Sequence, residues 1–138
     1  MAVEYLVEHS NVKPYLNLSW FRRRNELEGL DSYKSGIPKW RGRAGITYAT
    51  SYQSFDLRSD LFVRYESSSE ELEISGTRLR ESQRDDWVSV NLNLGIAFRQ
   101  RYRLNLDLIN LTDRKYMPAT ENLWAEQRSI HLKFSLDI

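Results

Sequence analysis

Apolar and polar residues alternate along this chain with a period of two, the pattern of a β-strand with one apolar face. In the last ten residues, 129–138, every even-numbered position is apolar and every odd-numbered position is polar. Six earlier segments show the same alternation, and helical periodicity is almost missing. The sequence therefore predicts an all-β protein whose strands are Ala2–His9, Val12–Arg23, Lys39–Thr50, Asp56–Glu66, Trp87–Phe98, Tyr102–Asn110 and Ser129–Ile138.

The predicted connections alternate strictly between short and long. Short turns are expected at 10–11, 51–55 and 99–101, and long structureless loops at 24–38, 67–86 and 111–128. This order predicts an antiparallel up-and-down sheet with short turns on one rim and long loops on the other. Such an arrangement is typical of outer-membrane barrels, whereas compact soluble domains rarely carry three long loops.

Alternation alone does not say which face of a barrel points inward, because a soluble barrel buries its apolar face and a membrane barrel turns it to lipid. Aromatic residues at the predicted strand ends favour lipid, since two interfacial belts require them there. The residues in question are Tyr48, Phe98 and Tyr102 beside short turns, and Trp20, Trp40 and Tyr65 near long loops. The polar face carries many charges, as the wall of a polar lumen would: Arg41, Arg43, Arg58, Arg64, Arg103 and His131 are expected to face it.

We therefore expect a transmembrane β-barrel segment of about seven antiparallel strands, whose apolar face contacts outer-membrane lipid. Two alternatives remain open at this point. One is a small soluble barrel that binds an apolar ligand, and the other is a self-contained small outer-membrane barrel.

Composition adds limits. The 138 residues are 41% hydrophobic and 28% charged, and a mean hydropathy of −0.62 suits a soluble domain or a barrel with polar loops. No apolar run is long enough for a transmembrane helix. A net charge of +1 gives no reason to expect nucleic acid, and the absence of cysteine excludes disulfides and thiolate ligands. The start MAVEYLVEHS is unlike a secretory signal, and bacterial single-chain barrels have even strand numbers, so we expect further strands upstream.

Three motifs carry a family resemblance. Residues 110–116 read NLTDRKY at the end of the penultimate strand, residues 37–48 read IPKWRGRAGITY, and residues 126–130 read EQRSI before the last strand. In this order and spacing they resemble the last strands of TonB-dependent outer-membrane receptors. Two departures are Gln127, where the family usually has glycine, and Ile138, where it usually ends in an aromatic residue.

The resemblance implies a bacterial outer-membrane location and energised uptake of a scarce ligand such as a siderophore, haem or cobalamin. It also implies partners outside this chain: an N-terminal plug, the remaining barrel strands, and the TonB energy-coupling protein that the plug contacts. The family motif, Asn110, Leu111, Thr112, Asp113, Arg114, Lys115 and Tyr116, is expected to act structurally, because Asn and Asp side chains close turns.

Candidate sites are few. A basic group at the first long loop could attract an anionic siderophore or a lipopolysaccharide phosphate at the point of ligand access: Arg22, Arg23, Arg24 and Lys34. Acidic residues of the second loop (Glu70, Glu71, Glu73, Asp85 and Asp86) lack the spacing of a calcium loop, so no metal site is predicted. No partner can be assigned to Glu66 or Asp107, and no nucleophile motif is present. We therefore expect neither enzymatic activity nor a cofactor.

Overall fold

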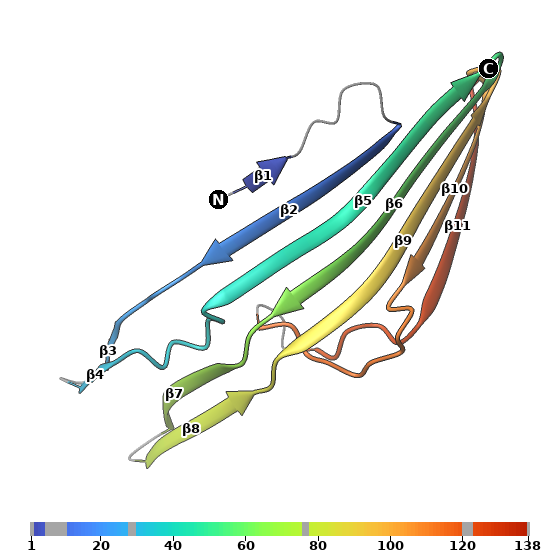
Figure 1. Cartoon of the computed structure of the whole chain (residues 1–138). Coiled ribbons are helices and arrows are strands. Elements are labelled where there is room, and N and C mark those ends of the chain that lie inside the picture. The colour runs from blue at the N-terminus through green and yellow to red at the C-terminus, as the bar shows by residue number, and fades with distance from the viewer. Residues whose placement is uncertain (1, 5–10, 28–29, 76–77, 120–122, 138) are drawn as a thin grey trace.

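A computed structural model of the chain describes residues 2–4, 11–27, 30–75, 78–119 and 123–137. Among these residues every regular element is a β-strand (Figure 1). Seven strands form one antiparallel sheet in chain order: β1 (Ala2–Glu4), β2 (Val12–Trp20), β5 (Trp40–Tyr52), β6 (Phe55–Glu66), β9 (Trp87–Phe98), β10 (Tyr102–Ile109) and β11 (Ser129–Leu136). No helix of the described chain is long and apolar enough to cross a membrane.

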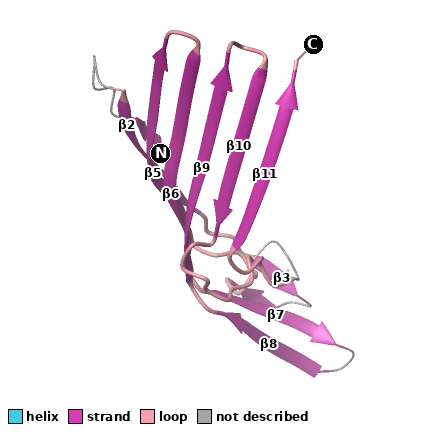
Figure 2. Cartoon of the chain, turned by 90° about the vertical axis from the view of Figure 1, so that its right-hand side faces the viewer, coloured by secondary structure: helices cyan, strands magenta, loops and turns pink. Residues whose placement is uncertain are grey.

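Two short hairpins project from the sheet. β3 (Asn25–Leu27) pairs with β4 (Leu30–Ser32), and β7 (Ser69–Ser75) pairs with β8 (Arg78–Arg84). Both lie at the rim of the long connections, and the short turns lie at the opposite rim beside the C-terminal end (Figures 1 and 2). The expectation of structureless long loops is therefore wrong for two of the three, because their backbone groups find partners within hairpins.

The all-β, antiparallel, up-and-down prediction is confirmed, and its strand bounds need correction. β2 ends at Trp20 rather than Arg23, since the chain leaves the sheet after a last backbone hydrogen bond from Phe21 N to Lys39 O at 2.8 Å. β5 continues to Tyr52 rather than Thr50 because Tyr52 still pairs with Phe55, which leaves a tight turn with Gln53 at φ 51°. Of the predicted strand Ala2–His9, the part beyond Glu4 lies outside the described residues.

The sheet curves: in Figure 2 strands β9, β10 and β11 face the viewer, while β2 and β5 are seen nearly edge-on. Its register is regular, and directly opposed residues share a face. One row across the middle is wholly apolar: Pro14, Ile46, Leu61, Leu92, Leu108 and Ile130. The adjacent row on the other face is polar: Lys13, Thr47, Asp60, Asn93, Asp107 and His131.

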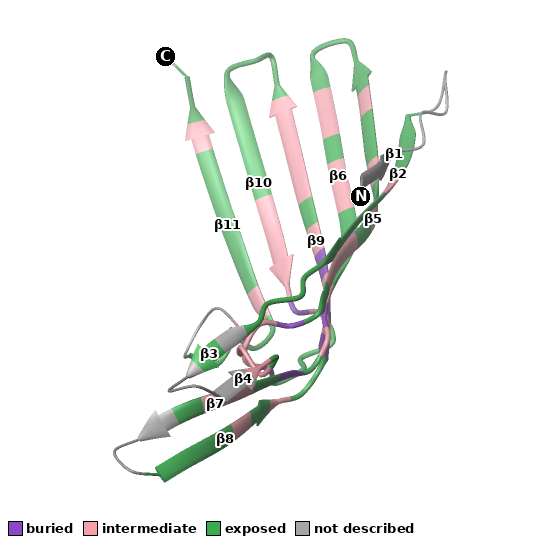
Figure 3. Cartoon of the chain, turned by 90° about the vertical axis from the view of Figure 1, so that its left-hand side faces the viewer, coloured by how far each residue is buried: buried purple, intermediate pink, exposed green. Residues whose placement is uncertain are grey.

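Buried residues gather at the long-loop end of the sheet (Figure 3). Among the described residues, the buried apolar and aromatic side chains include Phe62, Trp87 and Tyr116. Neither of the first two is on the apolar face: Trp87 opposes Glu66, and Phe62 opposes Asn91. The core of this chain therefore forms on its polar face, where the third long connection folds back onto the strands.

Candidate functional site

The apolar face of the sheet is uncovered. Leu61 in the central strand β6 is 46% exposed, and Leu132 and Phe134 of β11 are 67% and 64% exposed. A protein in water normally covers such a continuous apolar surface, since patches beyond a few hundred Å² mark interaction sites. Within the described chain no second layer packs against this face.

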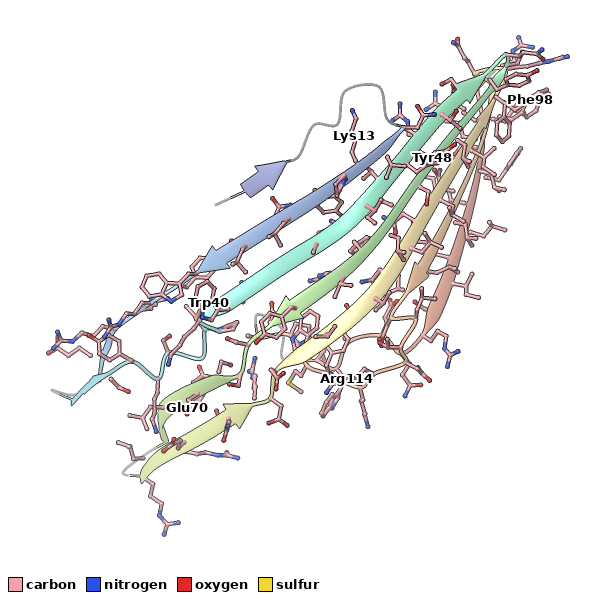
Figure 4. All side chains as sticks on the ribbon, viewed as in Figure 1. Lys13, Trp40, Tyr48, Glu70, Phe98 and Arg114 are labelled. Carbon is pink, nitrogen blue, oxygen red and sulfur yellow. The ribbon has the colours of Figure 1, made fainter. Side chains whose placement is uncertain are left out.

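Aromatic side chains lie near both ends of the apolar face (Figure 4). At the long-loop end, the Trp20 and Trp40 rings are 6.5 Å apart between centroids. At the short-turn end, Phe98 and Tyr102 are 6.3 Å apart. Tyr48, which the sequence places beside a turn, instead opposes Val12 inside the sheet, because β5 is longer than predicted and Tyr52 reaches the rim.

The six charged residues expected to line a lumen do share one face, as the register of their partners shows. Arg43 opposes Arg64, a like-charge pair that would be unfavourable without compensation. Arg43 is compensated by Asp60 of β6, at 2.7 Å between Nη2 and Oδ2. Arg64 instead lies over the ring of Trp87, with its guanidinium carbon 5.5 Å from the centroid.

A network around Arg43 joins three strands. The Tyr15 hydroxyl donates to Asp60 Oδ1 at 2.9 Å, and Arg43 Nε donates to the Tyr15 oxygen at 3.0 Å. The guanidinium also lies 3.7 Å from the Phe62 ring centroid. Gly45 makes this possible, because a Cβ there would come within 2.7 Å of the Tyr15 oxygen and within 2.8 Å of Phe62 Cβ. The network therefore fixes the middle of the polar face.

A second network anchors the third long connection to the sheet. Glu66, 8% exposed, forms an ion pair with Arg41 at 3.2 Å and accepts hydrogen bonds from Trp87 Nε1 at 3.2 Å and Ala119 N at 3.1 Å. Tyr116 stacks on Trp87, with ring centroids 4.1 Å apart. The sequence assigned no partner to Glu66. In the structure its partners come from two strands, Arg41 and Trp87, and from the third long connection, Ala119.

The family-like motif, residues 110–116, forms a closed turn around Asn110. The Asn110 side chain is fully buried, and its backbone has a positive φ of 53°. Its Nδ2 donates to the carbonyls of Arg114 at 2.8 Å and Glu126 at 3.0 Å, and its Oδ1 accepts from Arg114 N at 3.1 Å. Its backbone N–H donates to Asn91 Oδ1 at 3.0 Å. The Asn110 side chain therefore joins both arms of the connection, and the Asn110 backbone N–H ties this turn to strand β9.

Asp113 ties the same connection to the start of β11. Arg128 N donates to Asp113 Oδ1 at 2.9 Å, and the Arg128 guanidinium lies 3.3 Å from Oδ2. The backbone hydrogen bond and then the guanidinium hold the pKa of the Asp113 carboxyl below its usual value. The pKa of Glu126 is likewise lowered, first by the hydrogen bond from Ser129 and then by His131.

Ser129, His131 and Glu126 come together in space, which the sequence did not predict. His131 Nε2 lies 3.2 Å from Ser129 Oγ and 3.3 Å from Glu126 Oε2, and the Ser129 hydroxyl donates to that same carboxylate at 2.9 Å. A catalytic relay needs one ring nitrogen on the nucleophile and the other on the acid. Here both contacts use Nε2, so the geometry is that of a surface hydrogen-bond cluster.

The four predicted ligand-access residues are not one cluster. Arg22 and Arg23 line an open depression of about 300 Å³, and the Arg22 guanidinium lies over the Tyr33 ring at 4.5 Å. Lys34 lines a neighbouring depression of about 460 Å³ and forms ion pairs with Glu70, at 3.5 Å, and with Glu81. Those carboxylates raise the pKa of Lys34. Arg24 is exposed and lines neither depression.

The acidic residues of the second loop do not converge. Glu70 is paired with Lys34, and Gly36 lies against Glu71, whose carboxyl a Cβ at that glycine would meet at 2.9 Å. In the ranges that the structure describes, no three His, Cys, Asp or Glu residues are close enough to hold a metal ion.

Sequence reasoning missed two functional features. Lys39 joins Arg22 and Arg23 in their depression, and Trp87 forms the anchor for Tyr116. The signal for Trp87 was available, because a tryptophan at a polar-face position of a strand indicates that something covers it there. Lys39 lies fifteen residues beyond Arg24 and meets the basic group through the pairing of β2 with β5.

Comparisons of the chain with protein-family models, with curated proteins and with solved structures find no match.

Proposed function

We propose that this chain is part of the wall of an outer-membrane β-barrel, the C-terminal barrel portion of a TonB-dependent receptor for a scarce ligand such as a siderophore, haem or cobalamin. In this role the apolar face contacts lipid, the charged face lines the lumen, and the long connections lie outside the cell.

The uncovered apolar face carries the proposal. β5 has thirteen residues, which at about 3.3 Å per residue and a tilt near 40° span roughly 30 Å, the thickness of a hydrocarbon core. The Trp20–Trp40 pair lies near one end of the apolar face, and the Phe98–Tyr102 pair lies near the other. This is the placement of interfacial aromatic belts. A small soluble barrel would instead require this face to be enclosed.

The polar face supports a lumen rather than a second lipid contact. It combines ion pairs such as Arg43–Asp60 with a loop that folds over it at the Glu66 network. A plug in the lumen would meet these groups, and the energy-coupling protein would act through that plug. The receptor family itself is supported by the NLTDRKY, IPKWRGRAGITY and EQRSI motifs.

Fractionation of native cells tests the location. An antibody against residues 123–128, which are largely exposed, should detect the protein in the outer membrane, and detection in the aqueous fraction alone would refute the proposal. Uptake tests the role: a strain lacking the gene should lose protonophore-sensitive uptake of one labelled ligand among ferric siderophores, haem and cobalamin. Unchanged uptake of all of them would leave a structural barrel as the better interpretation.

A further inference from the structure

Three cationic side chains meet at one place on the long-loop rim. Arg22, Arg23 and Lys39 line the depression of about 300 Å³ together with the rings of Trp20, Phe21 and Tyr33. Among the described residues that line this depression there is no aspartate or glutamate. Lys34, in the neighbouring depression, is by contrast held by Glu70 and Glu81.

The cations of this depression are placed to bind an anion. In the described part of the chain, Arg22, Arg23 and Lys39 have no carboxylate within ion-pairing distance, whereas several strand arginines do. Arg22 stacks its flat face on Tyr33 at 4.5 Å. Stacking leaves the in-plane N–H groups of a guanidinium free for the paired hydrogen bonds that phosphate oxygens accept.

The position of the depression indicates the source of the anion. Trp20 lines it and also forms the aromatic pair with Trp40 at the end of the apolar face. In the proposed membrane orientation this pair lies at the level of the lipid headgroups. A phosphate bound beside Trp20 would therefore carry acyl chains that continue down the uncovered face past Leu18 and Leu16, which are 39% and 46% exposed.

We infer that the rim depression formed by Arg22, Arg23, Lys39 and the rings of Trp20, Phe21 and Tyr33 binds the phosphate of an anionic membrane lipid. The inference rests on the proposed membrane orientation. It assigns the basic residues of the first long connection to lipid contact rather than to the transported ligand.

Binding of phosphatidic acid with a fluorescent acyl chain to the full chain in a neutral maltoside detergent tests the inference. The variant Arg22→Gln/Arg23→Gln removes two of the three charges. Loss of a charge-assisted hydrogen bond weakens binding roughly tenfold or more, so we expect at least that increase in Kd. The matched control is Arg99→Gln/Arg101→Gln, which removes the same charge from exposed residues of the opposite rim and should change Kd less than twofold.

Lys39→Gln provides a second variant outside the Arg22–Arg23 pair and should also weaken binding by roughly tenfold. Phosphatidylcholine should compete weakly. Equal losses in the rim and control variants would mean non-specific attraction and would overturn the inference. Displacement of the lipid by inorganic phosphate at similar concentration would show that a free anion is preferred, and would overturn the lipid assignment.

Retention of the same chain in phosphatidylcholine vesicles after carbonate washing separates this inference from the proposed function. If the chain stays in the vesicles but shows no preference for phosphatidic acid in the detergent binding experiment, the lipid site is contradicted and the membrane orientation stands. Complete release by carbonate would count against both.

Discussion

Leu61→Arg places a charge in the middle of the apolar face. Leu61 follows Phe55, at the short-turn rim, by six residues of strand β6. At about 3.3 Å per residue and a tilt near 40°, it lies roughly 15 Å below that rim, half the thickness of a hydrocarbon core. Arginine on the lipid face at this depth costs about 2–4 kcal/mol, which lowers the folding equilibrium constant by a factor of roughly 30 to 700.

The same substitution in water would have a different outcome. Leu61 is 46% exposed, and substitutions at exposed positions without special contacts usually change stability by about 0.5 kcal/mol or less. Urea unfolding of the chain in phosphatidylcholine vesicles, followed by tryptophan fluorescence, measures the difference. Phe55→Arg at the rim should cost about 0–1 kcal/mol, and Asn93→Arg, on the polar face of the neighbouring strand, should be nearly neutral. A Leu61→Arg penalty no larger than that of Phe55→Arg would refute the reasoning.

Three further predictions concern the polar face and its loop. Gly45→Ala brings a methyl group within 2.7 Å of the Leu61 carbonyl and the Tyr15 hydroxyl. It should lower the free energy of unfolding in urea by about 1–3 kcal/mol. Gly95→Ala is the control, because its nearest contact is 3.3 Å, and it should lower that free energy clearly less. Asn110→Gly keeps the positive φ but removes the buried amide that pairs with the carbonyls of Arg114 and Glu126. The loss of about 1–3 kcal/mol should speed proteolysis of the connection 111–128, and unchanged cleavage would contradict the anchoring role. Because contacts with Arg128 depress the pKa of Asp113, its stabilisation of the loop is complete above its usual pKa and is lost as the pH falls through the lowered value. Amide exchange in the loop should therefore accelerate with acid, and Asp113→Asn should show less of this acid response than the parent chain.

The alternation of apolar and polar residues was sufficient to predict the strands of the main sheet and the shared face of Arg41, Arg43, Arg58, Arg64, Arg103 and His131. The alternation of short and long connections predicted the strand order. Neither pattern could predict where β5 ends, because Ser51 is a residue type that is common in turns and the pairing of Ser51 and Tyr52 with β6 is not visible in the sequence. The hairpin β7–β8 was missed since charged residues interrupt the apolar positions of both segments, SEELEIS and RLRESQR.

The site was predicted in part. Turn closure by Asn110 and Asp113 follows from local chemistry, so the sequence was informative there. The Glu66 network and the meeting of Lys39 with Arg22 depend on contacts between residues far apart in sequence, for which a single sequence carries no direct signal. The separation of Lys34 from Arg22 and Arg23 has the same origin, because β7 and β8 supply the carboxylates that hold Lys34.

Nitroxide scanning along β10 tests most directly the claim that the apolar face contacts lipid. The chain contains no cysteine, so single cysteines at Arg103, Leu104, Asn105 and Leu106 would each carry one label in phosphatidylcholine vesicles. The account predicts high oxygen collision rates at Leu104 and Leu106 and high rates for a water-soluble nickel chelate at Arg103 and Asn105. Labels at Leu104 and Leu106 that are shielded from both reagents, or that collide mainly with the chelate, would contradict it.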